Sequence, residues 1–193
     1  MSAALVAGGF PCDSIFDFVN GPTPSAAVPL LLKLLQVVDE PVVRGGIVRA
    51  LCTRDARGQA EQPLLNLFRS LEPGPGVESL KWAIGNTLEH LASAEIAKEL
   101  IDLAMDRRHR ETRQMIVLAL GKLKDPRANS ALIDLLLDDD VAAHAISAVR
   151  RKKMRQAIPH LLALATHSNP FVRRSALGAI KAIERKAGAG LVH

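Results

Sequence analysis

The sequence predicts an all-α protein, an α-solenoid of about five antiparallel helix pairs with a short N-terminal capping helix. Composition supports this, because hydrophobic residues make up 48% of the chain but aromatics only 3%, with no Tyr. Such a core suits close-packed helices better than sheets, which favour aromatic and β-branched residues. Two apolar markers also recur with a period of 29 to 36 residues, and the apolar residues around them follow helical spacing.

The first marker is a leucine-rich motif, LLxL or LIxL, and it predicts the first helix of each pair. Successive copies start 33, 36, 32 and 29 residues apart. Pro29, Pro63 and Pro159 lie close to expected helix starts, where the missing N–H costs little. The five copies begin at Leu31, Leu64, Leu100, Leu132 and Leu161.

The second marker is an alanine followed by an aliphatic residue, and it predicts the second helix of each pair. Its copies are 33, 36, 29 and 31 residues apart, so two independent markers keep nearly one period. A single helix pair cannot bury its apolar faces, and stacked pairs share a continuous core. The marker alanines are Ala50, Ala83, Ala119, Ala148 and Ala179.

We expect three parts along the chain: an arm with a capping helix at 1–24, a repeat domain at 25–186, and a flexible tail at 187–193. In the arm, "DSIFDFVNG" (Asp13 to Gly21) is expected to form a short helix. Its apolar side chains either cover the end of the core or form an aromatic ligand-binding patch. The expected repeat units are 25–58, 59–92, 93–125, 126–153 and 154–186.

Two segments resemble a known repeat: "SNPFVRRSALGAIKAIE" (Ser168 to Glu184) and "ETRQMIVLALGKLKDPRA" (Glu111 to Ala128). An Asp/Asn-Pro turn, a basic residue early in the helix and spaced Ala and Leu/Ile are similar to short HEAT-like repeats of the phycobilisome-lyase type. The other three units fit more loosely, and the resemblance covers about 25–186. The chain also resembles small bacterial HEAT-repeat proteins of unassigned activity. The resemblance implies an α-solenoid whose second helices line the concave side, and it says little about function.

The residues that HEAT-like enzymes need are not found, so we expect no catalysis and no cofactor. The deoxyhypusine hydroxylases bind iron through His-Glu dipeptides, which this sequence lacks. Alkylpurine DNA glycosylases need aromatics near the base, and here only Trp82 is available. No residues single out a tetrapyrrole site, so a relation to bilin lyases is a remote alternative. Asp140 and His144 are four residues apart and could share a helix face with a metal. We favour instead acids placed at a helix start, where negative charge is favourable, and we expect no metal site.

The resemblance implies that a groove follows the second helices, and it predicts a face for protein partners. The residues four before, one before and three after each marker alanine should point into it. An aromatic and a Met among polar groups are typical of contact hot spots. Trp82 either lies in this groove or fills the core between repeats. We expect a non-catalytic scaffold, of inhibitor or immunity type among other options. The candidate groove residues are Arg49, Trp82, Asn86, Met115, Leu118, Lys122 and His144.

Charge is concentrated at one end of the sequence. The net charge is +5, but residues 141–193 alone hold ten basic side chains and one acidic side chain. The turns between successive repeats should lie on one side of the stack and form a basic edge. This edge either is a set of solvated turns or binds phosphates. A protein partner is favoured over nucleic acid, because the basic edge lacks stacking aromatics. Its residues are Lys124, Arg127, Arg150, Arg151, Lys152, Lys153 and Arg155.

Three arginines, Arg44, Arg113 and Arg173, lie six residues before their marker alanines. Acids in nearby turns, such as Glu40 and Glu111, favour an internal ladder of ion pairs and hydrogen bonds between repeats.

Localisation is predicted from the cysteines and the apolar segments. The two cysteines form no CxxC pair, the N-terminal apolar run has no basic residues before it, and no window approaches about 18 apolar residues. We therefore expect a soluble cytoplasmic protein with no membrane contact.

Overall fold

The computed structural model describes residues 2–72 and 74–188, and every regular element in those ranges is helical. The chain forms two compact units, Met1–Leu91 (unit 1) and Ala92–His193 (unit 2). Each unit is a stack of helix pairs.

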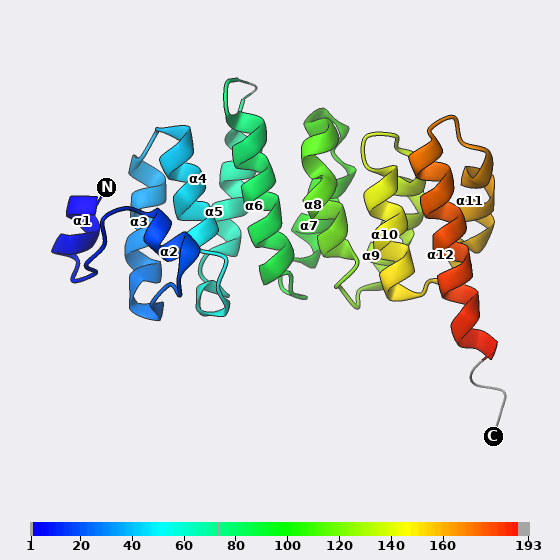
Figure 1. Ribbon diagram of the computed structural model, residues 1–193, viewed down its shortest axis with the longest axis horizontal. Helices are drawn as coiled ribbons and strands as arrows, with labels where there is room; N and C mark the ends of the chain where they lie inside the picture. Colours follow the sequence, from blue (N-terminus) through cyan, green and yellow to red (C-terminus); the bar gives the residue numbers. More distant parts are fainter. Residues whose placement is uncertain (1, 73, 189–193) are drawn as a thin grey trace. The chain divides into compact units, whose positions relative to one another are not determined.

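Unit 1 contains two helix pairs. Within each pair the two helices pack together, and α4 also packs along α6, so the second helices are neighbours (Figure 1). Short 3-10 helices, η1 (Ser25–Ala27) and η2 (Arg54–Ala56), precede the first helix of each pair. The pairs are α3 (Val28–Val37) with α4 (Pro41–Ala50), and α5 (Glu61–Ser70) with α6 (Val77–Leu91).

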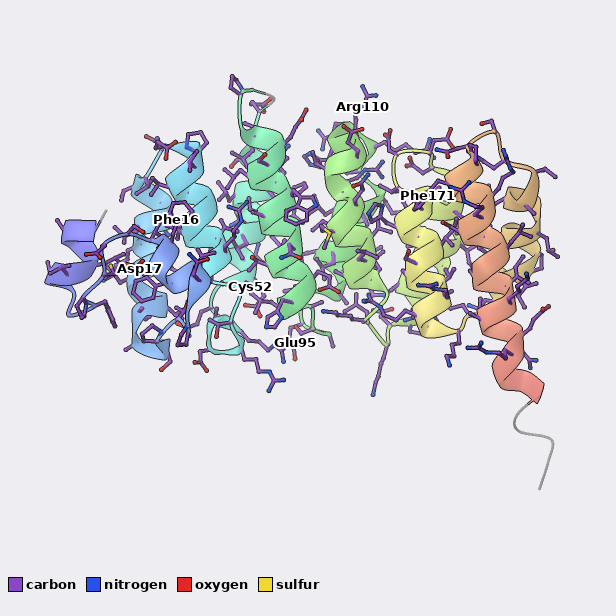
Figure 2. All side chains as sticks on the ribbon, in the orientation of Figure 1. Phe16, Asp17, Cys52, Glu95, Arg110 and Phe171 are labelled. Atoms are coloured by element: carbon purple, nitrogen blue, oxygen red, sulfur yellow. The ribbon has the colours of Figure 1, made fainter. Side chains whose placement is uncertain are left out.

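Two short helices precede these pairs, α1 (Ser2–Ala7) and α2 (Phe16–Asn20). α2 is the expected capping helix: it packs on α4 and buries Ile15 and Phe18, whereas Phe16 is more exposed (Figure 2). The Asp17 carboxylate accepts hydrogen bonds from two backbone N–H groups that precede the helix. α1 was not expected from the sequence, and its Leu5 is fully buried.

Unit 2 contains three helix pairs, in which α8 packs against α10 and α10 against α12 (Figure 1). Four 3-10 segments connect or extend the helices: η3 (Arg107–Arg113), η4 (Leu135–Leu137), η5 (Arg155–Ala157) and η6 (Leu164–Thr166). The pairs are α7 (Ala97–Met105) with α8 (Gln114–Leu120), α9 (Pro126–Asp134) with α10 (Ala142–Lys152), and α11 (Ile158–Ala163) with α12 (Pro170–Gly188).

Both sequence markers lie in the core. The first leucine of all five LLxL motifs is fully buried, and no marker alanine is more than 2% exposed. The first marker falls in α3, α5, α7, α9 and α11, and the second in α4, α6, α8, α10 and α12. The α-solenoid of five helix pairs is therefore confirmed. Of the tail predicted at 187–193, α12 includes residues up to Gly188, and 189–193 lie outside the described residues.

Candidate binding face of the second helices

In unit 1, the predicted groove residues lie at the surface of α4 and α6. Trp82 is 49% exposed, which excludes the alternative that it fills the core. Arg49 is also exposed on the neighbouring α4, and Asn86, one turn after Trp82, is half-buried. The packing of α4 against α6 therefore presents a large aromatic side chain with polar groups beside it.

In unit 2, a groove of about 510 Å³ crosses the exposed side of α8, α10 and α12. Leu118 and Ser147 occupy the position one before the marker alanine, and Arg151 and Ala182 the position three after it. These are two of the positions that helical spacing assigns to one face. We call this the unit 2 groove; its lining is Leu118, Ser147, Arg150, Arg151, Lys153, Ala182 and Arg185.

Met115 and His144, four residues before their marker alanines, are half-buried and do not line the unit 2 groove. In α4 the same position is Gly46, where an added Cβ would lie 2.7 Å from Ile15 Cγ2 of the capping segment. In α4 this position therefore faces the capping segment. Burial lowers the pKa of His144, and its Nδ1 atom is buried without a hydrogen-bond partner. Lys122, the remaining candidate, is exposed just after α8.

In the basic run from Arg150 to Arg155, some side chains donate hydrogen bonds to backbone carbonyls and others line the unit 2 groove. α10 ends at Lys152, and Lys153 adopts a left-handed conformation with φ 56° that closes the helix. Met154 is buried directly afterwards. Arg151 donates to the Leu118 carbonyl in α8, and Lys152 donates to the Leu123 carbonyl just after α8 ends. These two cations satisfy carbonyls near the end of α8, where positive charge also offsets the helix dipole. Arg150 and Lys153 line the unit 2 groove, and Arg151 lines it as well.

The rest of the predicted basic edge is also heterogeneous. Arg127 forms an ion pair with Asp125 at 2.6 Å, and this contact holds the pKa of the Asp125 carboxyl below its usual range. Lys152 is half-buried, and burial lowers its pKa. Lys124 and Arg155 are exposed. The seven basic side chains thus differ in how freely they can meet a ligand.

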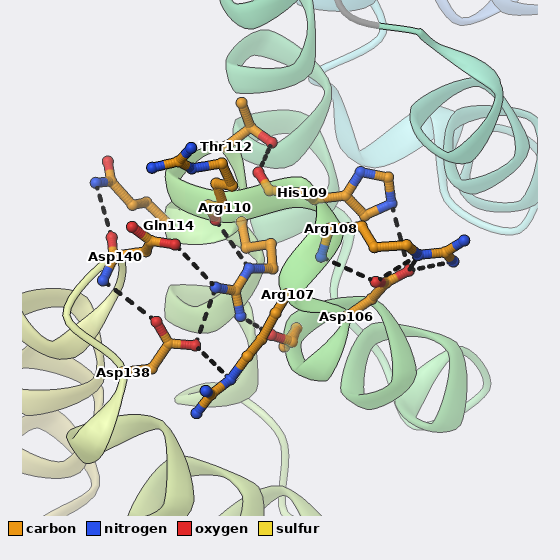
Figure 3. A network of polar contacts seen from close by, with 11 residues as sticks. Asp106, Arg107, Arg108, His109, Arg110, Thr112, Gln114, Asp138 and Asp140 are labelled. Atoms are coloured by element: carbon orange, nitrogen blue, oxygen red, sulfur yellow. Dashed lines mark hydrogen bonds and ion pairs between the residues drawn. The ribbon is translucent and has the colours of Figure 1, made fainter.

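A polar network in unit 2 lies around Arg107, Arg110, Asp138 and Asp140 (Figure 3), and the buried Arg113 is at its centre. The fully buried Arg113 guanidinium donates to the Ala104 carbonyl at 2.7 Å, to the Arg110 carbonyl at 2.8 Å and to Asp138 at 3.0 Å. Asp138 belongs to the turn of the next repeat and is only 7% exposed. The acid expected from the sequence was Glu111, and the observed partner is instead Asp138.

The other two arginines of the predicted ladder form hydrogen bonds within their own repeat, and not between repeats as the sequence suggested. Arg44 donates to the Leu35 carbonyl of α3, and Arg173 donates to the His167 and Ser168 carbonyls after η6. Each arginine thus satisfies carbonyl groups at or just beyond the end of the first helix in its own pair. Only Arg113 adds an ion pair with the next repeat among the described residues.

A second hollow, of about 470 Å³, lies between the first helices of unit 1 and was not expected from the sequence. Leu35, Gln36 and Arg44 form one side of it, and Gln62 and Asn66 of α5 lie on another. Its only charged lining residue is Arg44, which already donates to a backbone carbonyl.

Within 2–72 and 74–188 there is no group of three or more His, Cys, Asp or Glu side chains that could hold a metal ion. No helix in the same residues has the length and apolar character required to cross a bilayer.

Stacked helix pairs, alanine-marked second helices and a groove along them define a helical-repeat protein. A family model described as HEAT repeats matches residues 76–143, and another described as HEAT repeat matches 157–186. The two matches together cover about half of the chain, which belongs to the HEAT-repeat proteins. No curated protein matches it. HEAT repeats generally serve as scaffolds for protein interactions, and the family is typically non-catalytic.

Proposed function

We propose that this protein is a non-catalytic scaffold that binds a protein partner through the exposed face of its second helices. The observation that supports this most is the exposure of Trp82, which occupies in α6 the position that Leu118 and Ser147 occupy in the unit 2 groove. An inhibitor or immunity-type role, in which the module covers a site on its partner, is one form of this proposal.

The physical argument rests on what Trp82 gains when a partner covers it. Half of a large apolar side chain is in water, and its burial would be favourable. Trp and Arg are enriched among the residues that dominate binding energy in protein interfaces, and Arg49 lies on the adjacent helix. Truncation of such a residue typically costs about 2 kcal/mol or more, which is roughly thirtyfold in Kd.

The test is an affinity capture from the native cell lysate with the protein, with Trp82→Ala/Arg49→Ala, and with Lys33→Ala/Val37→Ala. The last variant is the matched control, because it also removes an exposed cation and an exposed apolar side chain, but from the first helix α3. We expect a partner that the protein and the control both retain and that the Trp82 variant loses. Equal capture of that partner by the folded Trp82 variant would contradict the assignment of the face.

Nucleic-acid binding, including a form resembling the alkylpurine DNA glycosylases, is the second candidate, and Arg150, Lys153 and Arg185 around one groove favour it. Against it, Arg151, Lys152 and Arg127 are held by carbonyls or by Asp125. Phosphate binding would weaken steeply with salt. Lack of binding to single-stranded and duplex DNA at low salt would exclude this candidate.

The proposal places the protein in the cytoplasm. The sequence supports this, because Cys12 and Cys52 form no CxxC pair and no recognisable disulfide framework.

A further inference from the structure

We propose that the unit 2 groove binds an extended, acidic segment of the protein partner. This proposal rests on the proposed function and adds the chemistry of the ligand and the place where it binds. The occupant is a stretch of partner chain that presents several carboxylates along one side.

The charge of the groove supports an anionic ligand. Four of its seven lining residues are basic and none is acidic. Arg150, Lys153 and Arg185 have no ion pair with any described residue, so their charges are available to a ligand. Arginine binds carboxylates through two parallel N–H donors, which adds geometric specificity to the charge.

The net charge of unit 2 also favours an anionic ligand. Unit 2 has 18 basic and 11 acidic side chains, a net charge of +7, whereas unit 1 has 7 and 9, a net charge of −2. A field of one sign around a concave site raises the association rate of ligands of opposite charge. The acidic segment is therefore directed to unit 2 before it makes contact.

The remaining lining favours a peptide over a nucleic acid. Leu118, Ser147 and Ala182 provide an apolar and small-residue floor, and none of the seven side chains is aromatic. Single-stranded nucleic acids usually stack their bases on aromatic side chains, worth about 1–3 kcal/mol per base. A peptide needs no such platform, because its backbone and small side chains can lie on the floor.

The dimensions suggest the length of the segment. The groove crosses three neighbouring helices, whose axes in packed pairs lie about 8–10 Å apart, so it spans roughly 20 Å. An extended chain rises about 3.3 Å per residue, so about six residues cross it. Side chains alternate between the two sides of such a chain, so acids at every second position face the groove together.

The experiment measures binding of a fluorescein-labelled peptide of alternating Glu and Ala, about eight residues long. The matched probe replaces Glu with Gln, and a thymidine oligonucleotide of about ten nucleotides tests for phosphate binding. We expect the Glu peptide to bind at low salt, to weaken as salt rises, and to bind more tightly than the other two. Absence of Glu-peptide binding, or equal affinity for the Gln peptide, would overturn the proposal.

Two charge-reversal variants locate the site. Arg150→Glu/Arg185→Glu removes two groove cations, and Lys124→Glu/Arg155→Glu makes the same change in net charge at exposed basic residues outside the groove lining. The first should weaken peptide binding by about tenfold or more, and the second by no more than about threefold. Equal losses in both variants, or tighter binding of the oligonucleotide, would assign the cations to phosphate binding along the basic edge.

A neutral variant tests the site without any change in charge. Ser147→Leu places bulk on the middle helix of the groove, and Ser130→Leu makes the same substitution at an exposed position of α9. Only Ser147→Leu should weaken binding of the Glu peptide. Unchanged binding by Ser147→Leu would show that the peptide binds elsewhere on the protein. None of these variants changes Trp82, so the two proposals can fail separately. If the Glu peptide does not bind the groove, but Trp82→Ala/Arg49→Ala still loses the captured partner, the groove is not the peptide site and the scaffold function stands.

Discussion

Gly121 and Gly178 show how strongly the surroundings of single residues differ along the second helices. A Cβ added at Gly121 would lie 3.0 Å from the Ala148 Cβ and 2.8 Å from the Arg151 guanidinium. A Cβ added at Gly178, within α12, meets nothing within 4 Å. The first glycine permits close approach of the next repeat, whereas the second leaves exposed helix without a side chain.

The two glycines therefore predict opposite effects of the same substitution. Gly178→Ala should raise the free energy of unfolding by about 0.5–1 kcal/mol, because alanine loses less backbone entropy in a helix. Gly121→Ala should lower it by about 1–3 kcal/mol, because Ala148 belongs to packed backbone that must shift. Urea denaturation of both variants measures this, and a gain for Gly121→Ala would contradict the packing described here.

His144 predicts a pH effect on stability. Burial lowers the pKa of this imidazole below its ordinary value, so below about pH 6.5 the unfolded chain binds a proton that the folded protein takes up less readily. The free energy of unfolding should therefore fall as the pH drops below this value, and His144→Leu should remove that part of the fall. The comparison is urea denaturation of both proteins at about pH 7.5 and about pH 5.5. An identical loss in both would show that another group is responsible.

At the scale of elements, neighbouring repeats are joined by polar contacts as well as by the apolar core. Arg113 reaches from the start of α8 to Asp138. Arg151 and Lys152 reach from the end of α10 back to the carbonyls of Leu118 and Leu123, which lie in and just after the C-terminal end of α8. These contacts lie at opposite ends of the second helices, because Arg113 precedes α8 and the other two close α10.

Removal of the buried arginine should be costly. Among the described residues, Arg113→Met leaves the buried Asp138 carboxylate with the exposed Arg107 as its one remaining cation, beside the Asp140 N–H that donates to it. Loss of one partner of a buried pair typically costs about 3–5 kcal/mol. Arg108→Met is the control, because the Arg108 side chain is 87% exposed and its pair with Asp106 should contribute about 1 kcal/mol or less. Chemical denaturation compares the two, and similar small losses would mean that Asp138 finds other partners.

At the scale of the whole molecule, most packing joins elements that are close in the sequence. The strongest contacts run from α4 to α6, from α8 to α10 and from α10 to α12, and from each second helix to its own first helix. Stability in such an array is approximately a sum of repeat and nearest-neighbour contributions. A destabilising substitution should therefore lower the stability of its own repeat and of the adjacent repeats more than that of distant repeats.

Hydrogen exchange of Arg113→Met tests this locality. Amide protection should fall most in α7, α8 and α10, which the Arg113 network joins, and less in α12. A uniform loss of protection over all described helices would show instead that the chain unfolds as one cooperative unit.

The sequence by itself determined the helix pairs, their number and their buried markers. The periodic leucines and alanines are local signals that recur in each repeat, and the first leucine of every motif and all five marker alanines lie in the core. The same spacing also predicted that Leu118 and Arg151 share a face, because positions four residues apart on one helix point the same way in every copy.

Only the tertiary structure decided which members of the basic run face a ligand. Arg150 and Lys153 line the groove while Arg151 also donates to α8, and this division depends on how α10 is rotated against its neighbour. The exposure of Trp82 and the choice of Asp138 over Glu111 as the partner of Arg113 have the same origin. Spacing along one helix shows which residues share a face, but contacts between repeats depend on packing distances and rotations that no single repeat encodes.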